Sequence, residues 1–397
     1  MVSAREADNP VTARLGVSAR VVAAPERILV IKSRHIGDVL LTGPLLAALH
    51  CRHPQARITL LVKADCATIV QDHPHVQEIL IFPQRQAGEG RMGFLLRTWR
   101  WFLALRAKRF DWVINTTEGD RGVIAGFLAG APRRLGVGSR REKRWRRLLM
   151  TERVANQPGL RHTVIRNLDL IGAGVTDEAR VVHLTIAPEA WTSVQGLLRE
   201  QGWDGVQPLV QVHPPSRWLF KCWTDSGMAQ VIDHIQQQGY RVVLTSGPAA
   251  QERRKNGVIV SLCQSPPLDM SGRLSLRQLA ALTAHCRLFF GVDTAPAHMA
   301  AALDVPVVVL FGPSGTFDWG PWPNGWTGQA TPYPRRNGTQ QAGPHWVIQK
   351  DWDCAPCGRD GCDGSKVSRC LEELAVHEVV PVLDRVLGRL EADGSGS

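Results

Sequence analysis

The chain has 397 residues, of which 44% are hydrophobic, and this fits a globular protein of two domains. Its formal net charge of +11 favours anionic partners, either nucleic acid, an acidic membrane surface or a phosphorylated substrate. No apolar run reaches the length of a membrane span, and residues 1–26 lack the apolar core of a secretion signal. We therefore expect a loosely ordered N-terminal arm and a cytoplasmic protein whose nine cysteines are mostly reduced.

The first half of the chain alternates short aliphatic runs with stretches of helical spacing. Residues 27–32 are typical of a buried parallel strand, and a loop that contains Asp38 follows directly. Further strands are predicted at residues 58–62, 79–82 and 112–114, and helices at 44–51, 92–108 and 122–128. This alternation predicts a doubly wound α/β domain, in which ligands bind at the carboxyl ends of the strands.

The positive charge is concentrated between Arg133 and Arg147, where eight basic residues accompany a single acid, Glu142. One interpretation is a solvated basic loop. A nucleic-acid surface would normally include several stacking aromatics, and only Trp145 interleaves here. An acidic lipid surface or a phosphorylated glycolipid fits the segment at least as well. The residues expected to contact such a glycolipid or the membrane are Arg140, Arg141, Lys143 and Arg144.

The alternation begins again near Pro208 and predicts a second α/β unit. Strands are expected at residues 209–212, 241–245, 288–290 and 305–311, and helices at 225–238, 276–284 and 297–303. Residues 312–353 are rich in Gly, Pro and Trp with little periodicity, and they are predicted to form a long loop. A final helix is expected at 371–390, and the join between the units is expected within 179–208.

The stretch Gly291 to His298, Gly-Val-Asp-Thr-Ala-Pro-Ala-His, joins a predicted buried strand to a predicted helix. Pro296 suits the first helical turn, and Asp293 and Thr294 are natural capping residues. The amides of such a turn lie at the positive end of the helix dipole and form a ready anion site. An ordinary strand-to-helix turn without a ligand is the alternative.

Two charged side chains lie in loops that follow predicted strands. The Asp38 carboxylate is placed to accept a proton from an attacking hydroxyl, or else it caps the helix that follows. Lys221 leaves the same sheet edge as the Asp293 turn, so both can reach one phosphate; the alternative is an ordinary surface lysine. An acid or amide within residues 247–252 is placed to hydrogen-bond a ribose.

Four cysteines near the C-terminus have the spacing C-x2-C-x4-C-x7-C, and clustered thiols of this kind can bind zinc. They are Cys354, Cys357, Cys362 and Cys370. Because the second pair is spaced unlike a zinc ribbon or finger, structural or redox-sensitive thiols are the preferred interpretation. The chain lacks the glycine motifs of P-loops, dinucleotide-binding turns and hydrolase elbows, which excludes those standard sites.

Five ordered motifs resemble glycosyltransferase family 9, the ADP-heptose:lipopolysaccharide heptosyltransferases. They are Ile-Gly-Asp-Val-Leu-Leu-Thr-Gly-Pro at 36–44, Lys-Cys-Trp at 221–223, Leu-Asp-Met-Ser-Gly-Arg-Leu-Ser-Leu at 268–276, the 291–298 stretch, and Val-Leu-Phe-Gly-Pro-Ser at 309–314. The resemblance spans residues 27–390, and the cysteine tail is most similar to the core heptosyltransferase III branch. It implies an α/β protein of the GT-B fold, with two Rossmann-like domains that face a central cleft.

The resemblance implies an acceptor-binding domain at residues 27–185, a nucleotide-sugar-binding domain at 186–370, and a C-terminal helix and tail at 371–397. Asp38 matches the general base of the family, and Lys221 matches the lysine on the donor diphosphate. Asp293 matches the acid that holds sugar hydroxyls. The other positions expected to contact the donor are Ser216, Arg217, Gln251, Glu252, Leu274, Ser275, Thr294, Ala295 and His298.

The implied reaction is an inverting transfer of heptose from ADP-L-glycero-D-manno-heptose to the inner core of lipopolysaccharide, without a metal or other cofactor. The implied partners are the nucleotide-sugar donor, the phosphorylated core acceptor and the anionic inner face of the inner membrane, but no nucleic acid. Two alternatives stay open. One is a family 9 transferase that acts on another glycan or on a protein, and the other is a basic nucleic-acid-binding α/β protein with a cysteine zinc module.

Overall fold

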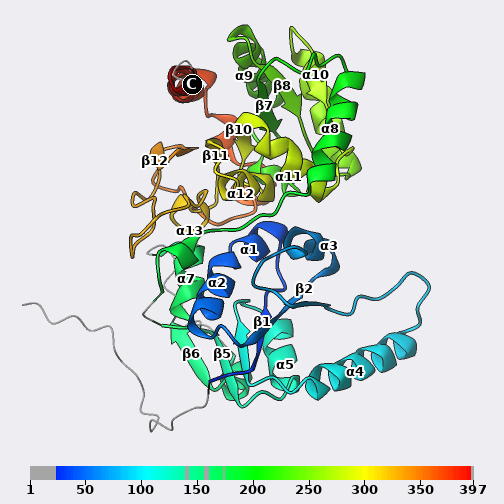
Figure 1. Ribbon diagram of the computed structural model, residues 1–397. Helices are drawn as coiled ribbons and strands as arrows, with labels where there is room; N and C mark the ends of the chain where they lie inside the picture. The colour runs from blue at the N-terminus through cyan, green and yellow to red at the C-terminus, as the bar shows by residue number, and fades with distance from the viewer. Residues whose placement is uncertain (1–23, 139–142, 156–160, 173–174, 395–397) are drawn as a thin grey trace, which may run out of the picture.

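The computed structural model describes residues 24–138, 143–155, 161–172 and 175–394, which form two stacked α/β domains (Figure 1). Within these residues, the N-terminal domain has a six-stranded parallel sheet in the order β3-β2-β1-β4-β5-β6. Its strands are β1 (Arg27–Ile31), β2 (Arg57–Val62), β3 (Glu78–Ile81), β4 (Trp112–Asn115), β5 (Arg133–Gly138) and β6 (Glu152–Ala155). The α/β alternation predicted from the sequence is confirmed for this domain.

Helices cover both faces of this sheet because its strands are apolar on both sides. Along β1, Ile28 and Val30 lie in the core of one face, and Leu29 and Ile31 lie in the core of the other. The first face is covered by α1 (Ile36–Leu40), α2 (Gly43–Arg52) and α7 (Thr163–Asp169), and the second by α4 (Arg91–Ala107) and α5 (Asp120–Leu128). Buried parallel strands of this kind place their loops and functional side chains at the ends of the sheet.

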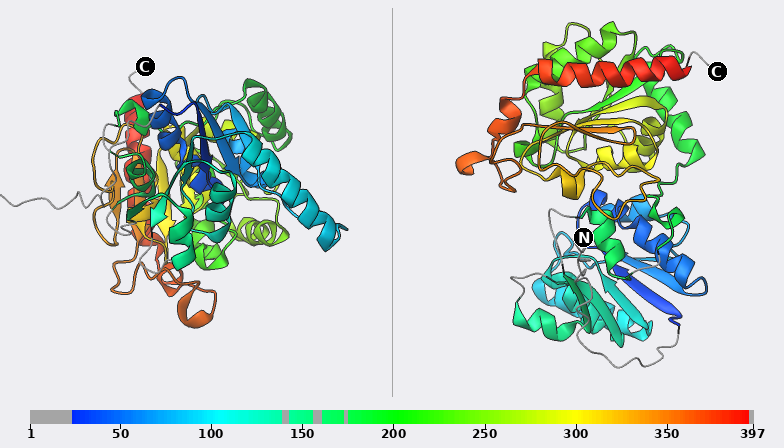
Figure 2. Two further views of the ribbon diagram at one scale, coloured as in Figure 1. Left: turned by 90° about the horizontal axis from the view of Figure 1, so that it is seen from below. Right: turned by 90° about the vertical axis from the view of Figure 1, so that its left-hand side faces the viewer.

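The C-terminal domain has a seven-stranded sheet in the order β12-β13-β11-β10-β7-β8-β9, in which the β12–β13 pair is antiparallel and the others are parallel. Its strands are β7 (Leu209–His213), β8 (Arg241–Leu244), β9 (Leu268–Asp269), β10 (Cys286–Val292), β11 (Val307–Phe311), β12 (Gln340–Ala342) and β13 (His345–Gln349). Its helices are α8 (Pro188–Glu200), α9 (Asp225–Gln237), α10 (Ala250–Leu262), α11 (Leu276–Ala284), α12 (Ala295–Ala302), α13 (Thr316–Trp319), α14 (Arg369–Glu372) and α15 (Val376–Gly394). Helix α15 packs on α9 along the outer side of this domain (Figure 2).

Residues 312–353 are not the long loop that the sequence predicts. They contain β12 and β13, and β13 lies inside the sheet between β11 and β12. All five residues of β13, His-Trp-Val-Ile-Gln, are buried, and Trp322 and Tyr333 of the same stretch of chain are fully buried. The prediction was wrong because the strands are short and are surrounded by glycine and proline, which hide a periodic signal.

The basic segment is not a loop throughout either. One part forms β5, and another part forms α6 (Arg144–Leu149). Of the four residues predicted to face the acceptor or the membrane, Lys143 and Arg144 are exposed, whereas Arg140 and Arg141 lie outside the described residues. The charges at the start of α6 are therefore presented by a helix rather than by a flexible loop.

The two domains pack directly on each other. Trp322 of the C-terminal domain lies in the same buried cluster as residues of α1 and α2, and α1 packs on α12. The Trp322 indole donates to the Arg180 carbonyl at 2.8 Å, and the Arg180 guanidinium donates to the carbonyls of Thr327 and Gly328, both at 2.9 Å. The helices that follow β1 and β10 therefore meet at the domain interface.

Candidate active site

Helix α1, which begins shortly after β1, contacts the first turn of α12 at Gly37. Asp38 therefore lies in the first turn of α1 and not in the loop that the sequence predicts. A methyl group built on Gly37 would lie 2.8 Å from Cδ2 of His298 and 3.5 Å from Cα of Ala295. The shorter of these distances leaves no room for a side chain, so glycine at this position allows α1 to approach α12. The next residue, Asp38, is thereby held close enough to the Asp293–His298 turn for its charge to act on His298.

Asp38 forms an ion pair with a buried lysine. Its carboxylate lies 3.4 Å from Nζ of Lys32, which follows β1 directly and also donates to the Thr116 carbonyl at 3.2 Å. Burial lowers the pKa of Lys32, and the adjacent carboxylate opposes this shift. His35 and Thr42 hold the N-cap positions of α1 and α2. The capping alternative for Asp38 is therefore wrong, because its carboxylate is fixed by the ion pair.

A second lysine–aspartate pair lies on the other side of the interface. Lys221 ends the short helix η3 (Leu219–Lys221), and its Nζ donates to Oδ2 of Asp293 at 2.6 Å. Burial raises the pKa of Asp293, but the Lys221 ammonium and the Ser314 hydroxyl outweigh burial and hold this pKa below its ordinary value. Lys221 is therefore not an ordinary surface lysine, and it lies at the Asp293 turn as the strand-end rule predicts.

His298 lies between the two ion pairs. Burial lowers the pKa of its ring, although the carboxylates of Asp293 and Asp38 act in the opposite direction. The ring is therefore neutral at pH 7. Its Nδ1 atom is buried and has no hydrogen-bond partner among the described residues. A buried polar atom without a partner is unusual in a folded protein, and at this position it is typical of a ligand-binding surface.

The first turn of α12 is free of side-chain caps. Thr294 occupies the N-cap position, but its hydroxyl donates to the Val292 carbonyl at 3.3 Å and caps no amide. Asp293 is engaged with Lys221 instead. The N-cap position predicted for Thr294 is confirmed, but neither side chain caps an amide, and the amides at the positive end of α12 are available to an anion.

Comparison with known proteins shows the family of the chain that carries this site. The model of glycosyltransferase family 9 (heptosyltransferase) matches residues 98–337, more than half of the chain. This chain belongs to glycosyltransferase family 9. Lipopolysaccharide heptosyltransferase 3 of Escherichia coli K12 is 32% identical to the enzyme over 315 residues, which cover 77% of this chain and 89% of that protein. Lipopolysaccharide heptosyltransferase 2 of Salmonella typhimurium LT2 is 28% identical over 307 residues, which cover 72% and 83%.

Two solved structures share the fold of the enzyme. The family 9 glycosyl transferase of Veillonella parvula DSM 2008 has a TM-score of 0.72 at 23% identity, and the match covers 92% of this chain and 97% of that one. The E. coli ADP-heptose lps heptosyltransferase II has a TM-score of 0.68 at 21% identity, with 92% and 99% covered. The expected GT-B fold is confirmed, and the enzyme is a glycosyltransferase.

Two residues expected at the donor lie in the loop after β7 of the enzyme. The buried Ser216 hydroxyl accepts a hydrogen bond from the Trp218 amide at 3.2 Å, so it organises this loop. The Arg217 guanidinium stacks over the Trp218 ring, 5.5 Å from its centroid, and is exposed. The loop thus presents the Arg217 charge to solvent, four residues before Lys221.

The residues expected at the ribose and adenine follow β8 and β9. Glu252 lies in the first turn of α10 and accepts from the Gly247 amide at 2.8 Å, whereas Gln251 is exposed. Ser275 forms a capping box at the start of α11, and Leu274 beside it is half-buried. The Glu252 carboxylate and the Ser275 hydroxyl therefore fix the conformation of the chain at this sheet edge, because each accepts a hydrogen bond from a backbone amide.

The four cysteines near the C-terminus are free thiols. Cys354 and Cys357 are exposed, and burial raises the pKa of the Cys370 thiol to about 11, with Cys362 acting in the same direction. In the part of the chain that the structure describes, no group of three or more His, Cys, Asp or Glu side chains is arranged to hold a metal ion. The geometry gives no support to the zinc alternative.

The sequence patterns do not single out Lys32 and His35, although both lie beside Asp38. Partial burial lowers the pKa of His35, and the Asp38 carboxylate opposes this shift. A usable signal exists for Lys32, because a lysine that ends an aliphatic strand must find a partner if it is buried. No comparable signal distinguishes His35 from an ordinary loop histidine.

Proposed function

We propose that the enzyme transfers heptose from ADP-L-glycero-D-manno-heptose to the phosphorylated inner core of lipopolysaccharide, as a heptosyltransferase of type III. Support for this substrate class comes from lipopolysaccharide heptosyltransferase 3, at 32% identity over most of both chains. The observation that carries the proposal is the contact at Gly37, because it brings the Asp38 carboxylate to the turn that holds the Lys221–Asp293 pair.

Asp38 is the proposed general base. Its carboxylate takes the proton of an acceptor hydroxyl while the hydroxyl oxygen forms a bond to the anomeric carbon of the donor. The bond between that carbon and the diphosphate oxygen breaks on the opposite face, and its electron pair leaves with ADP. The configuration inverts in this single displacement. Lys32 holds the carboxylate from its buried side and so fixes the direction in which Asp38 accepts the proton.

Lys221 and the α12 turn are proposed to neutralise the charge that develops on ADP. An ammonium group has three N–H donors, so Lys221 can keep its contact with Asp293 and still donate to a phosphate. The uncapped amides of the first α12 turn add further donors at fixed positions. With these groups supplying the positive charge, we propose that transfer needs no metal ion.

The acceptor of such an enzyme is anchored in a membrane, so we propose a cytoplasmic enzyme that binds peripherally to the anionic inner face of the inner membrane. No helix in the described chain is long and apolar enough to cross a membrane. The exposed Lys143 and Arg144 at the start of α6 support attraction to an anionic surface.

Incubation with ADP-heptose and a series of truncated core lipopolysaccharides, with mass detection of the added sugar, tests the proposal. We expect heptose to be added to an inner-core acceptor, and we expect the reaction to survive excess EDTA. Transfer only to another glycan or to a protein would show that the acceptor assignment is wrong. An absolute requirement for added Mg²⁺ or Mn²⁺ would exclude the metal-independent step.

A further inference from the structure

Helix α4 carries an apolar stripe that the enzyme leaves exposed. Met92, Leu95, Leu96, Trp99 and Leu103 are between 51% and 69% exposed. They recur at spacings of three and four residues, so they lie on one side of the helix. Large apolar side chains gathered in this way mark an interaction surface, whereas ordinary surface residues of this type are scattered singly.

The opposite side of α4 is also apolar, and it is packed. Leu105 is buried in the core below the helix, and Trp101 stacks on Phe82 with ring centroids 6.0 Å apart. Arg97 donates to both carboxylate oxygens of Glu89, at 2.9 and 2.8 Å, and this ties the helix to the preceding segment. Helix α4 is thus apolar on both sides, and its own domain covers only one of them.

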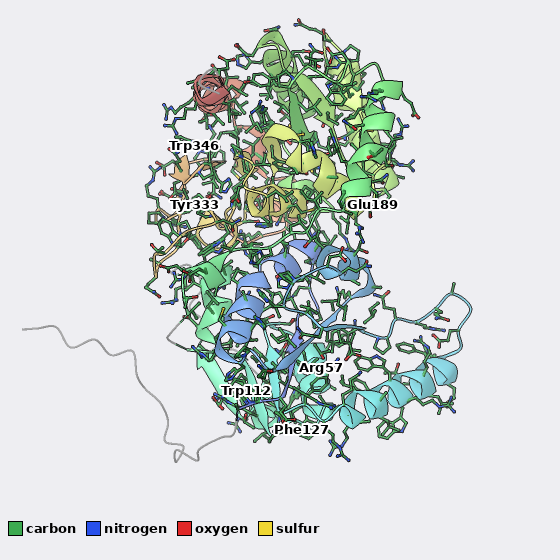
Figure 3. All side chains as sticks on the ribbon, viewed as in Figure 1. Arg57, Trp112, Phe127, Glu189, Tyr333 and Trp346 are labelled. Atoms are coloured by element: carbon green, nitrogen blue, oxygen red, sulfur yellow. The ribbon has the colours of Figure 1, made fainter. Side chains whose placement is uncertain are left out.

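Helix α4 projects from the N-terminal domain in Figure 1, and Figure 3 shows its side chains standing out from the ribbon. Its inner neighbour is α5, on which Ile124 and Phe127 are exposed to 39% and 44%. Helix α6 packs beside α5 and carries Leu148, which is 81% exposed. The three helices therefore adjoin, and each of them contributes exposed apolar side chains.

The charge around the stripe is positive. Residues 90–110 contain six basic residues and no acidic residue. The exposed arginines are Arg91, Arg100 and Arg106 on α4, and Arg144 and Arg147 on α6. An apolar stripe flanked by cations matches the interface of an anionic bilayer, where acyl chains lie below phosphate groups. Two copies of this surface would bring like charges together, which disfavours self-association through it.

We propose that α4 is a membrane-docking helix that lies in the plane of an anionic bilayer, with its apolar stripe in the acyl region and its arginines at the lipid phosphates. This rests on the proposed function in one respect, namely that the acceptor is a glycolipid of the same bilayer. The segment that leads into α4 leaves the sheet at the carboxyl end of β3, and Asp38 follows the carboxyl end of β1, two strands away in the same parallel sheet. Docking through α4 therefore keeps the edge that carries Asp38 near the membrane surface.

Vesicle sedimentation with two matched double variants tests this proposal. Leu95→Glu with Trp99→Glu places two charges in the stripe, four residues apart. Val258→Glu with Leu262→Glu makes the same change at positions of α10 that are 47% and 50% exposed, in the other domain. On vesicles of phosphatidylcholine and phosphatidylglycerol, we expect the α4 variant to bind on the order of tenfold more weakly than the parent, because insertion of apolar side chains drives such binding. The α10 variant should bind like the parent.

Transfer assays separate the docking proposal from the proposed function. With ADP-heptose and a lipid-free core oligosaccharide, the α4 variant should keep the turnover of the parent. With a vesicle-borne acceptor, the α4 variant should lose most of this turnover. Equal vesicle binding by parent and α4 variant overturns the docking proposal, whatever the transfer result. If the stripe instead holds a second copy of the chain, the α4 variant would lose self-association but bind vesicles like the parent. This result would also overturn the docking proposal. A parent that docks through α4 but transfers no heptose would refute the proposed function alone.

Discussion

The two lysine–aspartate pairs at the domain interface have the same chemistry and opposite exposure. In the N-terminal domain, the Lys32 side chain is 5% exposed and that of Asp38 is 13% exposed. In the C-terminal domain, Lys221 is 23% exposed and Asp293 is 8% exposed. One pair therefore presents its carboxylate, as an acceptor hydroxyl requires, and the other presents its ammonium, as a diphosphate requires.

This difference follows from where each lysine lies in its domain. Lys32 comes directly after a buried strand, whereas Lys221 ends a short helix in the loop after β7. Burial lowers the pKa of Lys32, while burial of Asp293 is outweighed by Lys221, so that the pKa of Asp293 lies below its ordinary value. In each pair the buried member positions its partner, and the more exposed member is left to act on a substrate.

Asp38→Asn should have the largest effect, because it removes the base but keeps the shape of the first pair. Transfer should slow on the order of 10²–10⁴-fold. Affinity for ADP should not change, since Asp38 belongs to the acceptor domain. Single-turnover transfer and calorimetry with ADP measure the two effects. Asp65→Asn, an exposed carboxylate of the same domain, is the matched control, and near-normal transfer by Asp38→Asn would exclude it as the base.

Lys221→Ala should differ from Asp38→Asn, because it should lose donor affinity as well as rate. A hydrogen bond to a charged group is worth about 1.5–3 kcal/mol, so ADP should bind on the order of 10- to 100-fold more weakly. Turnover should fall further, because the charge on ADP grows as it leaves. Lys350→Ala is the control, since Lys350 pairs with Glu378 in the same domain. Unchanged ADP affinity in Lys221→Ala would contradict the assigned role.

Gly37→Ala should disturb both pairs at once, because it acts on the contact between them. The added methyl group would lie 2.8 Å from the His298 ring, so α1 and α12 must separate. We expect turnover to fall on the order of tenfold, as small displacements of reacting groups cost this much or more. Gly196→Ala in α8, where no atom lies within 4 Å of the new methyl group, should be harmless. Equal turnover in the two variants would show that the close approach is not needed.

The parts of this arrangement that depend on local sequence are the parts that could be predicted. Aliphatic runs such as residues 28–31 predicted the strands, and the strand-end rule placed Asp38, Lys221 and Asp293 at the sheet edges. The contact between Gly37 and His298 could not be predicted, because it depends on how two separate sheets pack. The spacing within residues 92–108 predicted helix α4, but only packing decides which of its two apolar sides stays exposed.

The buried histidines of the scaffold and the ion pairs affect the free energy of unfolding in different pH ranges. Burial lowers the pKa of four histidines, His73, His162, His213 and His345, to about 3. The unfolded chain binds a proton at each histidine near pH 6.5, whereas the folded protein does not. The stabilising contribution is therefore complete above pH 6.5 and is lost as the pH falls toward 3. Asp293 contributes to this loss only near and below its ordinary pKa of 3.8.

His73→Gln should have the smallest of the expected effects. It removes one of the histidines whose protonation makes the free energy of unfolding depend on pH. Besides burial, the neighbouring His75 and His183 lower the pKa of His73. One histidine changes the free energy of unfolding by at most about 1.4 kcal/mol per pH unit. Between pH 7 and pH 5, the parent should therefore lose up to about 2 kcal/mol more than His73→Gln in urea unfolding. The exposed His377→Gln should follow the parent, and parallel pH profiles for all three proteins would show that His73 takes up its proton in the folded state.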